Sequence, residues 1–261
     1  MRPGGLAWEC VGQAGAPVVL LHSLATHRDI WRLQLPAWSA AFRLVCIDLP
    51  GHGSSPAPEA PLTLDDQAAL VCTVLDQLGI ERAAVVGLSW GGMVAQAMAL
   101  KAPSRVGSLV LAHTSAHTAP ALREIWQARI DDAAQRGIDA QVAPTLARWF
   151  TPAFIEASPM TMAWVARQIR ATSPEGYASA IRAIQALDHL EGLASIDVPT
   201  LVIAGEHDAA VPPQAASAMA ARMPRAELQV LGGAGHIGNV QQPLAFTEAV
   251  GRFLRGVGHP A

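Results

Sequence analysis

Short apolar runs, separated by longer amphipathic stretches, recur along most of this chain. The runs are rich in valine, leucine and isoleucine and are bounded by turn residues, as is typical of buried β-strands. They predict strands at residues 6–11, 18–22, 44–48, 83–86, 108–112, 199–205 and 227–231. Because the strands alternate with helical patterns, we expect an α/β fold with a mostly parallel sheet and helices on both of its faces.

The clearest helix is expected to begin after Thr63. A threonine can cap a helix at this position, and the aspartates at 65 and 66 are favoured near its positive end. The apolar residues between 70 and 78 share one face, and Gly79 is a typical residue to end a helix.

The alternation of strands and helices stops near residue 114 and resumes near residue 197. The stretch 115–196 contains helical segments broken by glycine and proline and no convincing strand. An insertion of this kind between two core strands predicts a helical lid over a functional site, so we expect a core of residues 1–114 and 197–261. The predicted lid contains three tryptophans, Trp126, Trp149 and Trp164. Packing against the core would explain any one of them, but we expect at least one of the three to line a pocket.

Composition excludes several classes of protein. The net charge is −3 with 15% charged residues and no basic run, so nucleic acid is not an expected partner. The apolar stretches are too short to span a bilayer, and residues 1–5 lack the apolar core of a signal peptide. The three scattered cysteines favour free thiols in a reducing cytoplasm. We expect no metal or other cofactor, since the histidines lie on different loops, and a homo-oligomer is compatible with the sequence.

The residues from Gly87 to Gly91 read G-x-S-x-G. Alone this motif is a weak signal, because glycine and serine often meet in ordinary loops. Here it follows the strand at 83–86 and precedes a helical run at 93–100, which is the context of a nucleophile elbow. The glycines leave room for a strained turn that lifts the hydroxyl of Ser89 above the edge of the sheet.

A serine nucleophile needs a base, and the base needs an acid that orients it. In strand–elbow–helix proteins the order along the chain is serine, acid, histidine. Asp208 and His236 each follow a predicted strand in this order, so we predict a triad of Ser89, Asp208 and His236. Glu206 is the alternative acid; both carboxylates could instead cap the next helix, and His236 taken alone could be a surface residue.

Two backbone N–H groups are expected to bind the oxyanion of the reaction. One belongs to Trp90, the residue after the nucleophile, and the other comes from the loop after the strand at 18–22. We assign the second donor to Leu24, with Ser23 as the alternative.

Together these residues resemble the α/β-hydrolase fold superfamily across essentially the whole chain, including its D-x-x-G-x-G-x-S loop at 48–55. Within the superfamily the chain is most similar to 3-oxoadipate enol-lactonases. The stretches that carry this resemblance are S-L-A-T at 23–26 followed by Trp31, G-L-S-W-G-G-M-V-A-Q at 87–96, R-W-F-T-P at 148–152, S-P-E-G-Y at 173–177 and G-H-I-G-N-V-Q-Q-P at 235–243. The chain departs from that family at His22 and Trp90. Both are expected to touch the substrate, which leaves the exact substrate open.

The resemblance implies a serine hydrolase of aromatic catabolism, in the β-ketoadipate pathway. It would open a small carboxylate-bearing enol-lactone through an acyl-enzyme. Such a substrate needs a cation in the pocket, and Arg129 is the first candidate because it lies one helical turn from Trp126. A solvated surface arginine is an equally good interpretation. Ser23 and Trp149 complete the expected substrate-binding set.

Three other functions compete with the lactonase. A general carboxylesterase would use the same triad and an acyl pocket of Trp90, Trp126 and lid aliphatics. A hydrolase of carbon–carbon bonds is a further option within this fold. A non-catalytic receptor for a small molecule is disfavoured, since it has no need for an intact triad. In every enzymatic case the partner is a small molecule. It is a lactone for the lactonase and an ester for the carboxylesterase.

Overall fold

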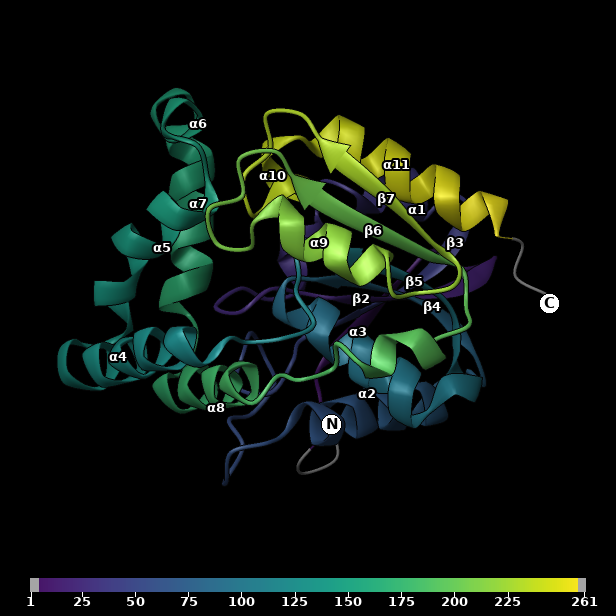
Figure 1. Cartoon of the computed structure of the whole chain (residues 1–261), viewed down its shortest axis with the longest axis horizontal. Helices are drawn as coiled ribbons and strands as arrows, with labels where there is room; N and C mark the ends of the chain where they lie inside the picture. The colour runs from purple at the N-terminus through teal and green to yellow at the C-terminus, as the bar shows by residue number, and fades with distance from the viewer. Residues whose placement is uncertain (1–4, 258–261) are drawn as a thin grey trace.

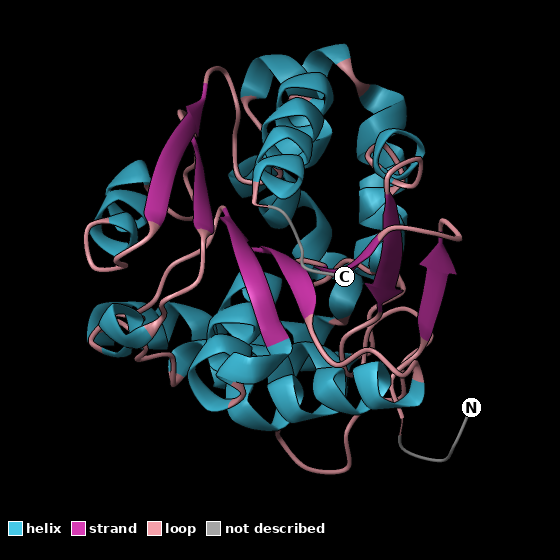
Figure 2. Ribbon diagram, turned by 90° about the vertical axis from the view of Figure 1, so that its right-hand side faces the viewer, coloured by secondary structure: helices cyan, strands magenta, loops and turns pink. Residues whose placement is uncertain are grey.

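A seven-stranded sheet with the order β1-β3-β2-β4-β5-β6-β7 forms the centre of the structure (Figures 1 and 2). The computed structural model describes residues 5–257, so most of the segment 1–5 considered for a signal peptide lies outside it. The strands are β1 (Trp8–Val11), β2 (Ala16–Leu21), β3 (Phe42–Ile47), β4 (Ala83–Leu88), β5 (Val106–Ala112), β6 (Thr200–Gly205) and β7 (Ala226–Leu231). Only β1 runs antiparallel to its neighbour within the described chain, which confirms the predicted mostly parallel α/β fold.

Burial explains why the strand patterns were visible in the sequence. All residues of β4 and β6 are buried, because helices cover both faces of a central parallel strand. At the edge of the sheet, β7 exposes Leu228 and Val230. Each predicted strand is present within a few residues of its expected ends.

Helices lie on both faces of the sheet, with α2 and α3 on one side and α1 and α11 on the other (Figure 1). The helices of the core are α1 (Leu35–Trp38), α2 (Leu64–Gln77), α3 (Trp90–Lys101), α9 (Pro213–Ala220), α10 (Gly238–Gln241) and α11 (Pro243–Gly256), with short 3₁₀ turns η1 (Arg28–Trp31) and η2 (Pro103–Arg105); the turn η4 (Gly192–Ser195) lies just before β6. Thr63 caps α2 as predicted, through a reciprocal pair of bonds with Asp66. None of the helices described between residues 5 and 257 is long and apolar enough to cross a membrane.

Between β5 and β6 the chain leaves the sheet and forms a separate group of helices. They are α4 (Pro120–Arg136), η3 (Ile138–Gln141), α5 (Val142–Trp149), α6 (Pro152–Ala157), α7 (Pro159–Arg170) and α8 (Pro174–Gln185). No strand occurs in this part of the described chain, where the only bridge joins His117 to Asp188. The carboxyl ends of β6 and β7 point toward this group (Figure 1).

The register of the sheet decides which loops meet. β2 and β4 are neighbours with Leu21 opposite Gly87, although β3 follows β2 in sequence. The chain therefore changes direction across the sheet between β2 and β4, and such a switch point opens a crevice at the carboxyl ends of the strands. The loop after β2 and the turn after β4 leave the sheet side by side at this crevice.

Candidate active site

The turn after β4 holds Ser89 in a strained conformation. Ser89 has φ 53°, a backbone region that favours glycine, and it directly precedes α3. A Cβ at Gly91 would overlap the carbonyl oxygen of Leu21, and one at Gly87 would overlap that of Gly91. Larger residues at these two positions would push the turn away from the sheet, which is the physical reason for the G-x-S-x-G spacing.

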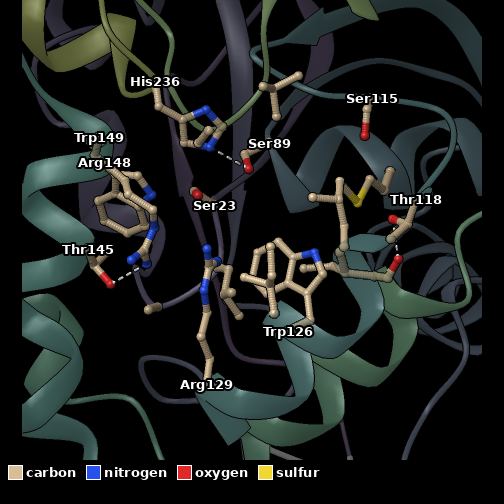
Figure 3. A pocket seen from close by; sticks show the side chains of 18 of the residues that line it. Ser23, Ser89, Ser115, Thr118, Trp126, Arg129, Thr145, Arg148, Trp149 and His236 are labelled. Carbon is tan, nitrogen blue, oxygen red and sulfur yellow. Dashed lines mark hydrogen bonds between the residues drawn. The ribbon is translucent and has the colours of Figure 1, made fainter. Parts of the chain in front are cut away.

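Three side chains from three loops form a continuous hydrogen-bonded chain. The Oγ of Ser89 lies 2.8 Å from Nε2 of His236 (Figure 3). Nδ1 of His236 lies 3.0 and 2.9 Å from the two carboxylate oxygens of Asp208. Burial alone would raise the pKa of the Asp208 carboxyl, but the facing His236 ring and the neighbouring imidazole bonds hold it well below its usual range. A base with an ionised acid on one side and a hydroxyl on the other can accept the hydroxyl proton.

Glu206, the alternative acid, points elsewhere. Its Oε2 accepts a hydrogen bond from the N–H of Gly233 at 2.8 Å and lies 3.6 Å from the ring of His207. Neither carboxylate caps the next helix, α9, which has no side-chain cap; Asp208 instead holds the loop that precedes it. Its Oδ1 accepts from the N–H groups of Ala210 and Val211 at 2.9 and 2.8 Å.

The two candidate oxyanion donors are backbone N–H groups that no other group of the described chain engages. Within the described chain, the N–H groups of Trp90 and Leu24 donate to no backbone or side-chain acceptor. The N–H of Gly91 donates to the carbonyl of His22 at 3.1 Å, which ties the loop after β2 to the start of α3. The N–H of Ser23 is equally without an acceptor among the described residues, so this alternative stays open.

The side chains of His22 and Trp90 do not reach the pocket, so the expectation that they touch the substrate is wrong. Both are buried, and the indole lies 5.8 Å from the His22 ring and 4.8 Å from the ring of His52. The Nε2 of His22 accepts the N–H of Leu49 at 2.8 Å, so its Nδ1 must carry the proton that it shares with the Ser23 carbonyl. Burial lowers the pKa of His22 to about 3, and the ring is neutral.

A pocket of about 270 Å³ opens in front of Ser89 and His236. Ser23 and Leu24 line it from the loop after β2, and Trp126, Arg129 and Trp149 line it from the helices between β5 and β6 (Figure 3). The structure thus brings Ser23, Trp126, Arg129 and Trp149 together at the pocket, whereas His22 and Trp90 lie outside its lining. Trp164 is not part of the lining; its ring packs under the guanidinium of Arg32 at 5.3 Å.

Two guanidinium groups face this pocket. Arg129 stacks over the ring of Trp126 at 4.2 Å, and Arg148 donates to Oγ1 of Thr145 at 3.0 Å. Neither forms an ion pair with a carboxylate of the described chain. Burial, followed by the charge of Arg148, lowers the pKa of Arg129 to about 10, so it stays protonated at neutral pH. These are two half-buried cations with no anion beside them.

The sequence analysis missed Arg148, Tyr177 and His113. Arg148 directly precedes Trp149 in a stretch already quoted for the family resemblance, and Tyr177 lies in another such stretch. Tyr177 is buried against the pocket, and burial raises the pKa of its hydroxyl. His113 lies beside Asp208, with its Nδ1 at 3.4 Å from Oδ2. No sequence pattern indicated that neighbour.

The described histidines are spread over several loops, as the sequence suggested. No group of three or more histidine, cysteine, aspartate or glutamate side chains between residues 5 and 257 is placed to hold a metal ion.

Comparison with known proteins places the chain in a family. Residues 16–243 match the profile of the α/β hydrolase fold, and the chain belongs to that family of hydrolases. It is 34% identical over 251 residues to 3-oxoadipate enol-lactonase 2 of Acinetobacter baylyi, which covers 96% of this chain and 93% of the relative.

Solved structures give the same assignment. The enol-lactonase from Burkholderia xenovorans LB400 matches with a TM-score of 0.92 and 35% identity over 96% of both chains. A thermophilic esterase from Thermogutta terrifontis matches with a TM-score of 0.92 and 29% identity, covering 97% of this chain and 94% of that chain. The predicted resemblance to the α/β-hydrolase superfamily and to enol-lactonases is confirmed.

Proposed function

We propose that this protein is a serine hydrolase that opens a small, carboxylate-bearing enol-lactone of the 3-oxoadipate type. The observation that carries the proposal is the pair of pocket arginines, Arg129 and Arg148, which have no carboxylate partner in the described chain. A protein rarely half-buries two guanidinium groups without an anion, because each loses hydration that a partner must replace. A substrate carboxylate supplies that partner.

The first half of the reaction forms an acyl-enzyme on Ser89. Nε2 of His236 takes the proton of the hydroxyl, and Oγ attacks the lactone carbonyl carbon. The resulting imidazolium is stabilised by the ionised Asp208. The oxyanion accepts hydrogen bonds from the N–H groups of Trp90 and Leu24, which donate to no other acceptor in the described chain.

Collapse of the tetrahedral intermediate breaks the ring C–O bond. The proton held by His236 goes to the departing enol oxygen, and the enol tautomerises to a ketone, which makes this step favourable. Water then enters, gives a proton to His236, and attacks the acyl carbon. Return of that proton to Ser89 releases the free acid and restores the enzyme.

The pocket suits a small substrate. Its volume of about 270 Å³ lies just below the range of pockets for drug-sized ligands. In the proposed pose the arginines hold the carboxylate, Ser23 lies beside the reacting carbonyl, and Trp126 and Trp149 flank the ring. We further propose that residues 115–196 act as a lid on this site, and that the enzyme acts in the cytoplasm on a small molecule without a cofactor.

A general carboxylesterase is the second candidate. One wall of the pocket is apolar, with Met93, Leu122 and Ile125 in its lining. This wall would accept a neutral acyl or alcohol group, and one structural relative is an esterase. The indole of Trp90 lies outside the pocket and cannot supply the acyl site first expected for this alternative.

The deciding experiment compares 3-oxoadipate enol-lactone with phenyl acetate, a neutral ester. Ser89→Ala should abolish both activities. Arg129→Met and Arg148→Met should each lower kcat/KM for the lactone by about tenfold to a hundredfold, the cost of one charge-assisted hydrogen bond, and leave phenyl acetate within about twofold. Arg32→Met is the matched control, since Arg32 also stacks on a tryptophan but lies outside the pocket.

Phenyl acetate turnover without lactone opening in the wild type would reject the lactonase and favour the esterase. Equal losses on both substrates in the arginine variants would reject carboxylate recognition by these side chains.

A further inference from the structure

The two oxygens of Asp208 differ in how they are held. Oδ1 accepts two backbone N–H groups of the loop that follows it, at 2.9 and 2.8 Å. Oδ2 accepts no backbone hydrogen bond within the described chain, and His236 Nδ1 lies 2.9 Å from it. The other polar group near Oδ2 is Nδ1 of His113, at 3.4 Å. Oδ2 therefore faces two imidazole rings, only one of which belongs to the proposed triad.

His113 is held in place by every element around it. It follows the last residue of β5 with φ 50°, a left-handed conformation, and its N–H donates to the carbonyl of Ile203 at 2.7 Å. The ring stacks on Phe246 of α11 with centroids 6.4 Å apart. A Cβ at position 238 would overlap Nε2, so Gly238 is the residue that lets the ring fit. The positive φ, the stacked ring and the space left by Gly238 hold Nδ1 3.4 Å from Oδ2 of Asp208, where it makes no hydrogen bond in this structure.

The protonation state of this ring follows from its surroundings. Its side chain is fully buried, and burial lowers its pKa, so the imidazole is neutral. The titratable groups that act on it are Asp208, from the loop after β6, and His236, from the loop after β7. Phe246 and Gly238 face it from α11 and α10. A carboxylate only accepts, so a neutral ring beside it places its single proton on Nδ1.

We propose that His113 is a positioning residue that donates its Nδ1–H to Oδ2 of Asp208 during the reaction. With donors on both oxygens the carboxylate cannot rotate away from His236 when Ser89 gives up its proton. The same bond withdraws some of the negative charge from Asp208, so that less of this charge acts on the imidazolium formed at His236. This inference rests on the proposed roles of Ser89, Asp208 and His236, and it assigns a fourth side chain to them.

The test uses two variants that differ in one N–H group. His113→Phe keeps an aromatic ring against Phe246 and removes the donor. His113→Asn is the conservative control, because its amide nitrogen is bonded to Cγ as Nδ1 is in histidine, and asparagine tolerates a positive φ. The readout is the rate at which a fluorophosphonate labels Ser89 as a function of pH, together with kcat and KM for phenyl acetate. His189→Phe, at a half-buried histidine remote from Asp208, controls for loss of an imidazole.

In His113→Phe the fall of the labelling rate on the acid side of the pH profile, here called the acid limb, should move to higher pH by about half a unit to one unit. Asp208 then stabilises the imidazolium of His236 more strongly. At neutral pH kcat should fall by about tenfold with KM unchanged. His113→Asn should restore most of the rate and the wild-type limb. A folded His113→Phe with the wild-type profile would overturn the proposal, and so would equal losses in both variants with no shift of the limb.

Because phenylalanine is unfavourable at a positive φ, a second measurement uses the unaltered protein. The ¹⁵N chemical shifts of the His113 ring, assigned by their absence from the His113→Asn spectrum, should show Nδ1 protonated and Nε2 unprotonated at neutral pH. The opposite tautomer would overturn the proposal. If the wild type is not labelled, or if Ser89→Ala is labelled equally, the proposed triad itself is rejected. If labelling requires Ser89 but is the same in the His113 variants, only this inference is rejected.

Discussion

The buried histidines make the stability of this protein depend on pH. His52 is fully buried, its Nδ1 is shared with the carbonyl of Pro50 at 2.9 Å, and its Nε2 has no hydrogen-bond partner in the described chain. Burial, followed by the neighbouring His22, lowers the pKa of His52 from 6.5 to about 3. His22 has the same lowered value for the same leading reason. Protonating either ring in the folded protein is therefore unfavourable.

The sign and size of the effect follow from linkage. A histidine with a lowered folded-state pKa contributes its full stability above the unfolded value of 6.5, and that contribution falls as pH drops toward about 3. At pH 5 the unfolded ring is almost fully protonated while the folded ring is not. The free energy of unfolding therefore falls by about 2 kcal/mol per histidine between pH 7 and pH 5, and by about 4 kcal/mol for the pair.

Other groups do not reverse this trend. His113 and His189 also have lowered pKa values and act in the same direction. Asp208 has a lowered pKa, so its contribution is lost only when pH falls below the ordinary carboxyl range, outside this window.

The assay is urea unfolding at pH 7 and pH 5, followed by tryptophan fluorescence. His52→Gln removes one titrating group, so its loss between the two pH values should be about 2 kcal/mol smaller than that of the wild type. His207→Gln, at an exposed histidine that meets water in both states, should retain the wild-type difference. If His52→Gln loses as much stability as the wild type over this range, the neutral buried ring is not the cause and the reasoning is refuted.

Two further predictions concern the frame of the site. The side chain of Gln241 joins the segment after α5 to the loop that carries His236. Its Nε2 donates to Thr151 Oγ1 at 2.7 Å and to the carbonyl of Gly233 at 2.9 Å. Its Oε1 accepts hydrogen bonds from the N–H groups of Thr151 and Gly235. Gln241→Leu should lower the free energy of unfolding by about 2–4 kcal/mol and reduce kcat, whereas Gln242→Leu next to it should do neither, as urea unfolding and phenyl acetate kinetics would show. Because Ser89 has φ 53°, Ser89→Gly should be more stable than Ser89→Ala by about 1 kcal/mol with both inactive; equal stability in thermal unfolding would mean that the elbow stores no backbone strain.

Local patterns predicted much of this protein, because the forces that produce them act over a few residues. The buried strands were visible since parallel central strands need continuous apolar runs. The start of α2 followed from the hydroxyl of Thr63, and the elbow from two glycines without which the turn would clash with β2 and α3. The order of Ser89, Asp208 and His236 followed from the position of each behind a strand.

Other features were decided only by tertiary structure. Asp208 and Glu206 both contact the loop after β7, and only packing decides which of them reaches the base: Asp208 faces the ring of His236, whereas Glu206 accepts the N–H of Gly233. Packing places the indole of Trp90 against the buried rings of His22 and His52, outside the pocket lining. Arg148 and His113 joined the site because packing brought distant segments together, and the direction of a side chain across such a contact is not encoded in its neighbours along the chain.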